Sequence, residues 1–438
     1  MRFQLSAILL TSAVSVALAS VASAADLPRH GVLGAVLADK DDVVTIKAVA
    51  PGSAAALAQI EPGDVILSYG PERITTSAQL VQDVRRTPSG TTIDLVIVRN
   101  GLNKSISLTL APPANEDDPN VATLYESISV QNSLRRVLFD VPKHLAGRHP
   151  AVLLIGGIGC FSVDVASNAE NGYLRITRDL ARRGIVTMRL EKSGVGDSQG
   201  PPCHDVDFED ESASYAVALD ALRRDDHVDP AHIYLLGHSI GTLIAPRLAL
   251  KENVAGVILS EAVGRDWFEY ELQNLRRQLD LGGDPPQVVD EKMQSKEYCM
   301  HRLLIARDPE SQIEADNPSC KLRNGIYPVA APYMQEVAAL NVIEPWTRLE
   351  VPVLVVYGTS DYVVAPEDNQ RIADVVNQRH SGLATIIAVD HMDHNLQFAA
   401  TPADFYAAND QGSKTHYQPE FSEAVLKWIC GRERCSDG

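Results

Sequence analysis

The stretch that decides the fold is Ile233-Tyr234-Leu235-Leu236-Gly237-His238-Ser239-Ile240-Gly241. Its first half is a short apolar run with β-branched and aromatic residues, which is typical of a buried strand. The second half has the pattern Gly-x-Ser-x-Gly, and helical periodicity follows over 240–250. Small residues around Ser239 permit a strained turn between strand and helix, with the serine hydroxyl projecting above the sheet. The sequence therefore predicts a strand, a sharp turn that carries Ser239, and a helix.

Apolar runs and helical segments alternate on both sides of this turn, from about Val121 onward. The predicted strands are 151–155, 185–190, 232–236, 254–259, 351–356 and 384–389, and the predicted helices are 173–183, 208–223, 240–250, 366–377 and 422–429. Strands that alternate with helices predict an α/β fold with a doubly wound, mainly parallel sheet, covered by helices on both faces.

The stretch 264–345 interrupts this alternation. It contains two cysteines, many prolines, and Leu272, Leu275 and Leu279 at helical spacing. Leucines three and four residues apart lie on one face of a helix. We therefore expect a helical cap inserted between two strands of the sheet.

Residues 121–436 resemble an α/β-hydrolase of the serine hydrolase or serine aminopeptidase type, and two further motifs support the resemblance. The segment Arg189-Leu190-Glu191-Lys192-Ser193-Gly194-Val195-Gly196-Asp197-Ser198 is similar to a loop that follows the fourth strand in many members. The segment Ile155-Gly156-Gly157-Ile158-Gly159-Cys160 is similar to the glycine-rich oxyanion loop, with its usual histidine replaced by Ile155 or Gly156. The resemblance implies an oxyanion hole formed by backbone N–H groups of Ile240 and of Ile158 or Gly159.

The acid and the base of such an enzyme should follow the serine in chain order. The apolar run 353–357 ends in Gly358-Thr359-Ser360-Asp361, which places Asp361 at the carboxyl edge of the sheet. Asp361 is therefore the predicted acid, with Asp368 as the alternative. Asp368 is the weaker candidate because it falls inside the helix expected to begin at Pro366.

The predicted strand 384–389 is followed by Asp390-His391-Met392-Asp393-His394. The resemblance favours His394 as the base, with His391 as the alternative. Two histidines and two aspartates could instead bind a metal such as Zn²⁺. No matching His or Cys cluster occurs elsewhere in the sequence, so we expect no metal and no other cofactor.

These residues imply a mechanism in which His394 takes the proton from Ser239 while Asp361 orients the imidazole. The serine would attack an acyl carbonyl, and water would release the acyl-enzyme. Activity should fall below roughly pH 6–7, as His394 protonates. The leading hypothesis is a hydrolase of carboxylic esters or amides; the alternatives are a serine peptidase or acyl-aminopeptidase-like enzyme, and an inactive hydrolase that acts as a binding protein.

A smaller unit precedes the hydrolase, at 30–110. It resembles a PDZ domain of the bacterial protease type through Ala50-Pro51-Gly52-Ser53-Ala54-Ala55 and Ile60-Glu61-Pro62-Gly63-Asp64-Val65-Ile66. The expected strands include 43–46 and 93–98. Between them we expect a helix over 78–86, capped by Ser77, with Leu80, Val81 and Val84 on one face.

PDZ domains bind extended peptides at a sheet edge. The resemblance implies that Leu33, Gly34 and Ala35 belong to the loop that would bind a peptide C-terminus; the alternative is a module used for packing or dimerisation. Residues 111–120 contain three prolines and three acids within 111–119 and predict an extended linker between the two units.

The N-terminus has a positive Arg2, an uncharged apolar run and Ala22-Ser23-Ala24, which together predict a secretory signal peptide over 1–24. The alternative is an uncleaved membrane anchor, and no later stretch is apolar enough to span a membrane. Six cysteines in an exported chain favour disulfides. We expect Cys299 with Cys320 and Cys430 with Cys435, which leaves Cys160 with Cys203; the resemblance places the last pair beyond adjacent strands.

The chain contains 39 Lys and Arg against 57 Asp and Glu, a formal charge of −18 over 438 residues. A nucleic-acid-binding surface needs clustered positive charge, and no Lys/Arg-rich run is present. Nucleic acid is therefore excluded as the main partner. We expect a periplasmic or secreted protein whose partners are a small ester or peptide substrate and, at the PDZ domain, a peptide C-terminus.

Overall fold

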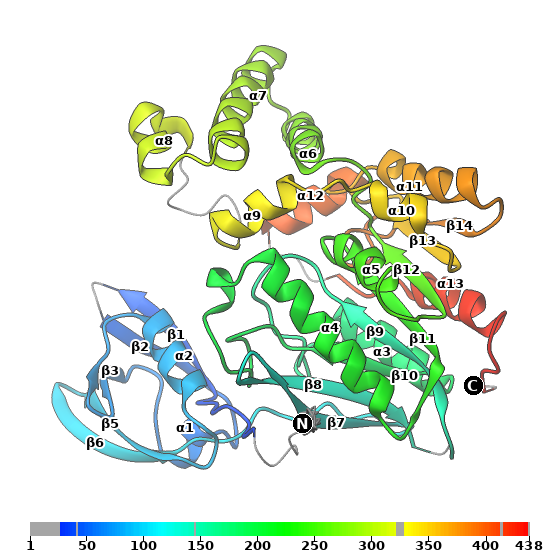
Figure 1. Ribbon diagram of the computed structural model, residues 1–438. Coiled ribbons are helices and arrows are strands. Elements are labelled where there is room, and N and C mark those ends of the chain that lie inside the picture. The colour runs from blue at the N-terminus through cyan, green and yellow to red at the C-terminus, as the bar shows by residue number, and fades with distance from the viewer. Residues whose placement is uncertain (1–26, 41–42, 144–145, 321–327, 412–414, 437–438) are drawn as a thin grey trace, which may run out of the picture.

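Figure 1 shows a computed structural model that describes residues 27–40, 43–143, 146–320, 328–411 and 415–436. The predicted signal peptide lies outside the described residues. The chain forms a small antiparallel unit followed by a larger α/β unit, and the two lie side by side in Figure 1. In the described part of the chain, no helix is both long enough and apolar enough to cross a membrane.

The N-terminal unit is a twisted sheet with strand order β1-β2-β3-β5-β6, in which β4 pairs with β3 and every pairing is antiparallel. Its elements are β1 (Ala35–Lys40), β2 (Val43–Val49), α1 (Ala54–Leu57), β3 (Val65–Tyr69), β4 (Glu72–Arg73), α2 (Ser77–Arg86), β5 (Thr92–Arg99) and β6 (Leu102–Thr109). Alternate residues such as Val44, Ile46, Leu95 and Ile97 are buried, because successive strand side chains point to opposite faces.

Helix α2 differs from the sequence prediction in two details. Its N-cap is Thr76, whose side chain accepts a hydrogen bond from the N–H of Gln79, whereas Ser77 bonds Asp39. Leu80 and Val84 are buried, but Val81 is 39% exposed. The predicted apolar face was therefore one residue too wide, and Val81 points away from the core of its own unit.

The larger unit has the sheet order β14-β13-β12-β11-β9-β10-β8-β7. Its strands are β7 (Val121–Val130), β8 (Ser133–Pro142), β9 (His149–Ile155), β10 (Val186–Leu190), β11 (Val228–His238), β12 (Gly256–Ser260), β13 (Val353–Gly358) and β14 (Ala384–Val389). The pairings from β10 through β14 are parallel, whereas β8 and β7 are antiparallel additions. The predicted doubly wound, mainly parallel α/β fold is confirmed.

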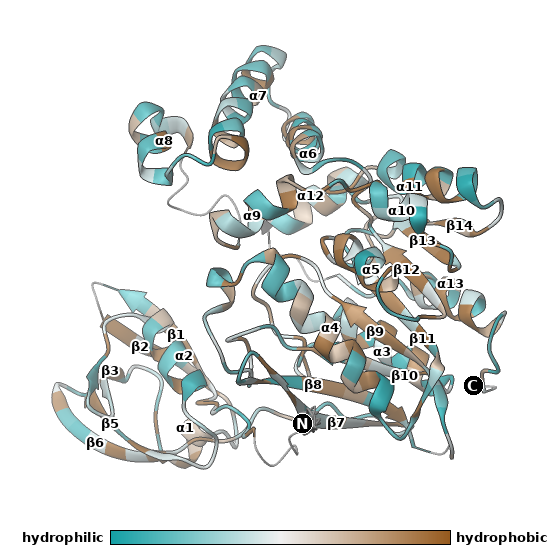
Figure 2. Cartoon of the chain, viewed as in Figure 1, coloured by the Kyte–Doolittle hydropathy of each residue, from teal (hydrophilic) through white to brown (hydrophobic). Residues whose placement is uncertain are grey.

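Helices cover both faces of this sheet (Figure 1). They are α3 (Gly172–Arg182), α4 (Phe208–Arg224), α5 (Gly241–Ala249), α11 (Pro366–Arg379) and α13 (Pro419–Cys430), with the short η2 (Cys203–Asp205) before α4 and α12 (Pro402–Gln411) before α13. Helices α3 and α13 pack on one face, and α4, α5 and α11 on the other. The strands between them are apolar almost throughout (Figure 2), as expected for a sheet buried on both sides.

The inserted segment is helical, as expected. It contains α6 (Trp267–Leu281), α7 (Pro286–Met300), a π-helical turn η3 (His301–Ile305), α8 (Glu310–Asp316), η4 (Pro318–Cys320), α9 (Ala331–Ala338) and α10 (Glu344–Arg348). In α6 the buried residues are Trp267, Tyr270 and Asn274, whereas the leucines that predicted the helix are only half-buried. Its inward face is thus aromatic and polar, and the leucine pattern identified the helix without identifying that face.

The segment 111–120 has little regular structure, as predicted, but it is not a free linker. Glu116 is buried against Arg189, with Oε2 2.6 Å from Nη2. Asp118 is also buried and pairs with Arg182 at 2.6 Å. A charge that is buried away from water is stable only when an opposite charge lies beside it. The connection is therefore bound to the α/β unit.

Candidate active site

Ser239 lies at the carboxyl end of β11, immediately before α5. Its φ of 53° is left-handed, an uncommon conformation for a residue with a side chain. The turn needs glycines on both sides: a Cβ on Gly237 would lie 2.6 Å from the carbonyl oxygen of Gly241, and one on Gly241 would lie 2.2 Å from that of Ile155. The motif therefore forms the tight strand-to-helix turn that its small residues predict.

Ser239, His394 and Asp361 form one chain of hydrogen bonds. His394 Nε2 lies 3.1 Å from Ser239 Oγ, and His394 Nδ1 lies 2.8 Å from Asp361 Oδ2. The second oxygen of Asp361 accepts a hydrogen bond of 2.6 Å from the N–H of Val363. The three side chains come from the ends of β11, β13 and β14, which meet at one edge of the sheet.

The alternative residues lie elsewhere. His391 is exposed, and its Nδ1 faces the carbonyl oxygen of Ala400 at 2.9 Å. Asp368 is buried in an ion pair with Arg265. Asp393 accepts hydrogen bonds from the backbone of Asn395 and Gln397, so it belongs to the turn that holds His394. The side chains of the Asp-His-x-Asp-His run therefore point in different directions, which does not fit the metal site considered from the sequence.

Burial and the neighbouring carboxylate set the charges in this chain. Burial opposes a charge on His394, but Asp361 outweighs it through its negative charge and its hydrogen bond, so the pKa of His394 lies above 6.5. For Asp361, burial alone would raise the pKa, and the opposite effect of His394 lowers it below 3.8. The geometry and charges allow His394 to accept the proton of Ser239 while Asp361 stabilises the resulting cation.

The glycine-rich loop after β9 lies beside the serine. A Cβ on Gly157 would sit 3.4 Å from the Cβ of Ser239, which is van der Waals contact, so the loop backbone passes directly beside the serine. Gly157 and Ile158 line the cavity above Ser239, whereas Gly159 lies against Phe161 and Pro328. Of the expected oxyanion donors, Ile240 directly follows the serine and Ile158 lies in the loop facing it. Both stay predictions, and Ile158 is better placed than Gly159.

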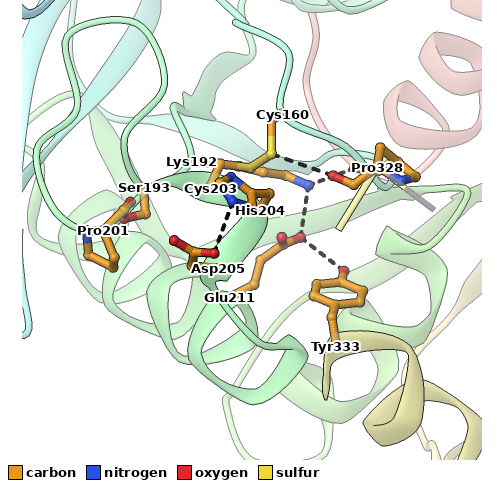
Figure 3. Close-up of a disulfide and its surroundings, with 11 residues drawn as sticks. Cys160, Lys192, Ser193, Pro201, Cys203, His204, Asp205, Glu211, Pro328 and Tyr333 are labelled. Atoms are coloured by element: carbon orange, nitrogen blue, oxygen red, sulfur yellow. Dashed lines mark hydrogen bonds and ion pairs between the residues drawn. A yellow bond between two sulfur atoms is a disulfide. The ribbon is translucent and has the colours of Figure 1, made fainter. Parts of the chain in front are cut away.

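An ionic contact and a disulfide connect the glycine-rich loop after β9 to neighbouring segments (Figure 3). Lys192 Nζ donates to the carbonyl oxygen of Gly157 at 2.7 Å. The same Nζ pairs with Glu211 at 3.0 Å, as Figure 3 shows. A disulfide joins Cys160 to Cys203, and so connects the loop after β9 to the loop after β10. The structure also joins Cys299 to Cys320 and Cys430 to Cys435.

Sequence reasoning missed Tyr173 and His238, which connect the loop after β9 to the loop that carries His394. The N–H of Gly157 donates to Tyr173 Oη at 2.8 Å, and Tyr173 Oη lies 2.7 Å from His238 Nδ1. His238 Nε2 faces the carbonyl oxygen of His394 at 2.9 Å. Burial lowers the pKa of His238 to about 3, so the ring is neutral. Nε2 carries its proton because it faces a carbonyl oxygen, whereas Nδ1 can accept from the Tyr173 hydroxyl. The available signal was the position of His238 directly before the serine.

A cavity of about 680 Å³ lies above the serine. Aromatic side chains of Phe161, Tyr173, Trp267 and Tyr270 line it, together with the amides of Asn171, Asn274, Asn395 and Gln397. Glu271 is the acidic residue of its roof, and that carboxylate lies 3.2 Å from Lys296 Nζ. The wall is therefore aromatic and polar but nearly uncharged.

In the N-terminal unit, the predicted peptide-binding residues lie at the start of edge strand β1. Leu33 is buried, and Ala35 begins β1. Gly34 has a φ of 74°, and a Cβ there would lie 2.3 Å from that of Ser53. A cavity of about 970 Å³ separates α2 from the hydrolase loop that includes Cys203. A peptide role for this edge stays a prediction.

Comparison with known proteins identifies both units. The family model of serine aminopeptidase S33 matches residues 168–398, more than half of the chain, and that of the PDZ domain matches 31–110. Esterase EstD of Thermotoga maritima is 22% identical over 297 residues, 66% of this chain and 64% of that protein. A probable periplasmic serine endoprotease, DegP-like, of a Marinomonas species is 31% identical over 108 residues, 25% of this chain and 22% of that protein.

The chain thus spans less than two thirds of the length of either relative. Among solved structures, Est1E of Butyrivibrio proteoclasticus with bound ferulic acid gives a TM-score of 0.46 at 15% identity, covering 70% of this chain and 98% of that one. On the family match, the chain belongs to the serine aminopeptidase S33 family of α/β-hydrolases, and it carries a PDZ domain before its hydrolase domain.

Proposed function

We propose that this protein is an esterase-like serine hydrolase that cleaves uncharged carboxylic esters through an acyl-enzyme on Ser239. The observation that carries the proposal is the hydrogen-bond chain from Ser239 through His394 to Asp361, on a serine held in a left-handed turn. A nucleophile, a base and an orienting acid in this order are what acyl transfer requires. The similarity to an esterase over 66% of the chain supports the same chemistry.

In the proposed reaction, His394 removes the proton of Ser239 as Oγ bonds to the ester carbonyl carbon. The N–H groups of Ile240 and Ile158 would stabilise the oxyanion, each contributing roughly 10²–10³-fold to the rate. His394 then gives its proton to the leaving alcohol as the C–O bond breaks. A water molecule, deprotonated by His394, attacks the acyl-enzyme and restores Ser239.

The cavity wall favours a neutral substrate with an apolar or aromatic group. Trp267 and Tyr270 offer apolar surface, and the surrounding amides can bond a polar oxygen. An aminopeptidase substrate carries an ammonium group, for which Glu271 is the acidic residue in the roof. That carboxylate already lies 3.2 Å from Lys296, so the site is less suited to a cationic substrate.

The test compares the wild type with Ser239→Ala on p-nitrophenyl esters and on aminoacyl p-nitroanilides, with a fluorophosphonate probe as a label. We expect ester hydrolysis and labelling in the wild type, and a loss of about 10⁴-fold or more in the variant. Ser260→Ala is the matched control, because Ser260 is a buried serine at the end of the neighbouring strand. Turnover of nitroanilides alone would favour the peptidase; neither turnover nor labelling would reject the enzyme.

We also propose that the protein acts in the periplasm or outside the cell, after cleavage behind Ala24. Three disulfides among the described cysteines and the DegP-like relative support an oxidising compartment. Mass spectrometry of protein from the periplasmic or extracellular fraction should find Ala25 at the N-terminus. Full-length protein confined to the cytoplasm would contradict this location.

The PDZ domain would supply a second binding site, for a peptide with a free C-terminus. Strand β1 lies at the edge of its sheet, where a peptide can add as a further strand. Exposed Val36 on β1 and Val81 on α2 offer apolar contacts near this edge. A fluorescent peptide library in free-acid and amidated forms tests the idea: preference for the free acid supports it, and equal or absent binding contradicts it.

A further inference from the structure

Glu261 is a buried carboxyl group that the proposed reaction does not use. It directly follows β12, its side chain is fully buried, and its φ of 53° is left-handed. Its backbone N–H donates to the carbonyl oxygen of Val356 at 3.2 Å, and its Oε1 accepts from the N–H of Gly358 at 2.7 Å. The side chain therefore crosses from the end of β12 to the end of β13, toward the loop that carries Asp361.

Glu261 reaches the same small volume as the acid and the base. One ligand-type atom from each of Glu261, Asp361 and His394 can be chosen so that all three lie within 4.8 Å of one another. Both oxygens of Asp361 already accept hydrogen bonds, from His394 and from Val363. The second oxygen of Glu261, Oε2, is buried and meets no donor within the described residues. An oxygen in that position is best satisfied when it carries a proton itself.

The charges around Glu261 favour the same protonation state. Two buried carboxylates at this separation cannot both be ionised without a large penalty, and Asp361 is the one paired with His394. The other acidic group that acts on Glu261 is Asp393, and among the described residues no Arg or Lys is named as compensating the charge of Glu261. Burial, followed by the charge of Asp361, raises the pKa of Glu261 well above 4.5.

We propose that Glu261 is a neutral carboxylic acid that donates a hydrogen bond to Asp361 and acts as a positioning residue for His394. This inference rests on the proposed function, because it acts through the base of that reaction. The donated proton would restrict rotation of the Asp361 carboxylate, whose other contacts orient the imidazole. It would also allow Asp361 to keep its charge in a buried site; a hydrogen bond from Glu261 adds to the effect of His394 in lowering the pKa of Asp361.

The activity test compares Glu261→Ala with Glu261→Gln. The alanine variant loses the donor, and we expect kcat to fall about 10- to 100-fold with KM little changed. Glutamine keeps both a donor for Asp361 and an acceptor for Gly358, so it should recover most of that loss. In Glu261→Gln, the pH at which kcat/KM falls on the acid side should stay within about 0.3 pH units of the wild-type value, because no charge is removed.

If Glu261 were ionised, Glu261→Gln would remove a negative charge beside His394. The pH at which kcat/KM falls on the acid side would then decrease by about half a pH unit or more. That shift would overturn the proposal. So would an alanine variant that folds and keeps the wild-type kcat. A wild type that neither hydrolyses esters nor reacts with a fluorophosphonate would instead reject the proposed function, which keeps the two failures distinct.

The pH dependence of stability tests whether Glu261 is protonated, and this measurement does not depend on enzyme activity. In the unfolded chain Glu261 ionises near its ordinary value of 4.5, whereas the folded protein keeps it neutral, so the wild type loses stability as the pH rises above that value. Glutamine does not titrate. The melting temperature of Glu261→Gln minus that of the wild type should therefore increase steadily from pH 4 to pH 8.

Asp118→Asn is the matched control for this measurement, because Asp118 is a buried acid with the opposite behaviour. Burial would raise its pKa, but hydrogen bonds from Asn120 and Arg182 lower it below 3.8. The wild type thus has this stabilisation above that value and loses it as the pH falls, so the variant should be destabilised at pH 7 and less so at acid pH. A constant difference between Glu261→Gln and the wild type from pH 4 to pH 8 would overturn the proposal.

Discussion

The floor and the roof of the active-site cavity are built in different ways. The floor consists of Ser239, Asp361 and His394, which lie at the ends of strands packed on both faces. The roof is α6, whose Trp267 and Tyr270 face the cavity from the inserted segment. The floor is held by the pairing of β11 to β14, whereas α6 is held by packing against α7, α9 and α12; the disulfide between Cys299 and Cys320 joins α7 to η4 in the same insertion.

This difference separates reaction from selectivity. The side chains of the floor are joined by hydrogen bonds from Ser239 to His394 and from His394 to Asp361, and the proposed reaction needs such fixed positions. The roof presents aromatic rings and amides, which in the proposed reaction would select the shape and polarity of a substrate without touching the reacting atoms. Changes in the floor should therefore lower kcat, and changes in the roof should alter KM.

The largest effect is expected from His394→Ala in the floor. Without the base, kcat should fall at least about 10⁴-fold, because Ser239 would lose its proton acceptor. His391→Ala is the matched control, since His391 is exposed and bonded to Ala400. Steady-state kinetics on one p-nitrophenyl ester measure both. Equal losses in the two variants would show that the floor is not organised around His394.

Trp267→Ala tests the roof. Loss of the indole removes apolar contact with the substrate, so KM should rise about tenfold for esters with a large acyl group, with a smaller change for acetyl esters. Tyr298→Ala is the control, because Tyr298 lies on α7 of the same insertion and is 40% exposed. A fall in kcat with unchanged KM would place Trp267 in the floor instead.

The disulfides offer a smaller and more graded test. Replacing Cys160 and Cys203 by serine frees the loop that contains Ile158, and kcat should fall about fivefold through looser oxyanion donors. Replacing Cys299 and Cys320, 21 residues apart, should leave kcat nearly unchanged and lower stability by about 3 kcal/mol. Kinetics and thermal melts of both double variants decide whether the two bridges serve different regions.

The Cys430–Cys435 bridge is the control for that comparison, because it joins residues only five apart at the end of α13. Its double serine variant should match the wild type in kcat. If it lowered kcat as much as the Cys160 and Cys203 pair, the loss would reflect general destabilisation.

The smallest effect concerns the acid limb of activity. The pKa of His394 is raised above 6.5, and the reaction needs the neutral imidazole, so kcat/KM should fall as the pH drops through a value above 6.5. Asp393 contributes to that shift through its negative charge. Asp393→Asn should therefore move the limb to lower pH by a few tenths of a unit, measured from pH 5 to pH 9. A shift to higher pH would contradict this charge effect.

The floor was more predictable than the roof because local patterns encode it. A strand that ends in Gly-x-Ser-x-Gly, one that ends before Asp361 and one that ends before His394 all lie in order along the sequence. Parallel strands bring their carboxyl ends to one edge, so the order alone indicates that these residues meet. In the roof, leucine spacing predicted a helix in α6 but not its buried aromatic face, since burial depends on what lies opposite.

Other misses have the same origin. The hairpin of β7 and β8 was not predicted as strands. Its turn residues Gln131 and Asn132 have the positive φ that a two-residue turn requires, which is visible only in the structure. Residues 111–120 were predicted as an extended linker and not as a segment bound to the α/β unit, because a sequence does not show that Arg189 lies within 3 Å of Glu116. Tyr173 and His238 likewise meet only through tertiary structure, because α3 packs on the sheet beside β10 and β8 and its first turn reaches the end of β11.

By itself, the sequence determined the α/β class, the PDZ-like unit before it, and the order of the candidate serine, acid and base along the chain. These follow from residue periodicity and from turns that only small residues can form. Only the tertiary structure brought His394, and not His391, within hydrogen-bond distance of Ser239, placed Glu261 near Asp361 and turned the aromatic face of α6 toward the serine. Such contacts join residues far apart in the chain, and their distances depend on sheet register and helix packing rather than on local preference.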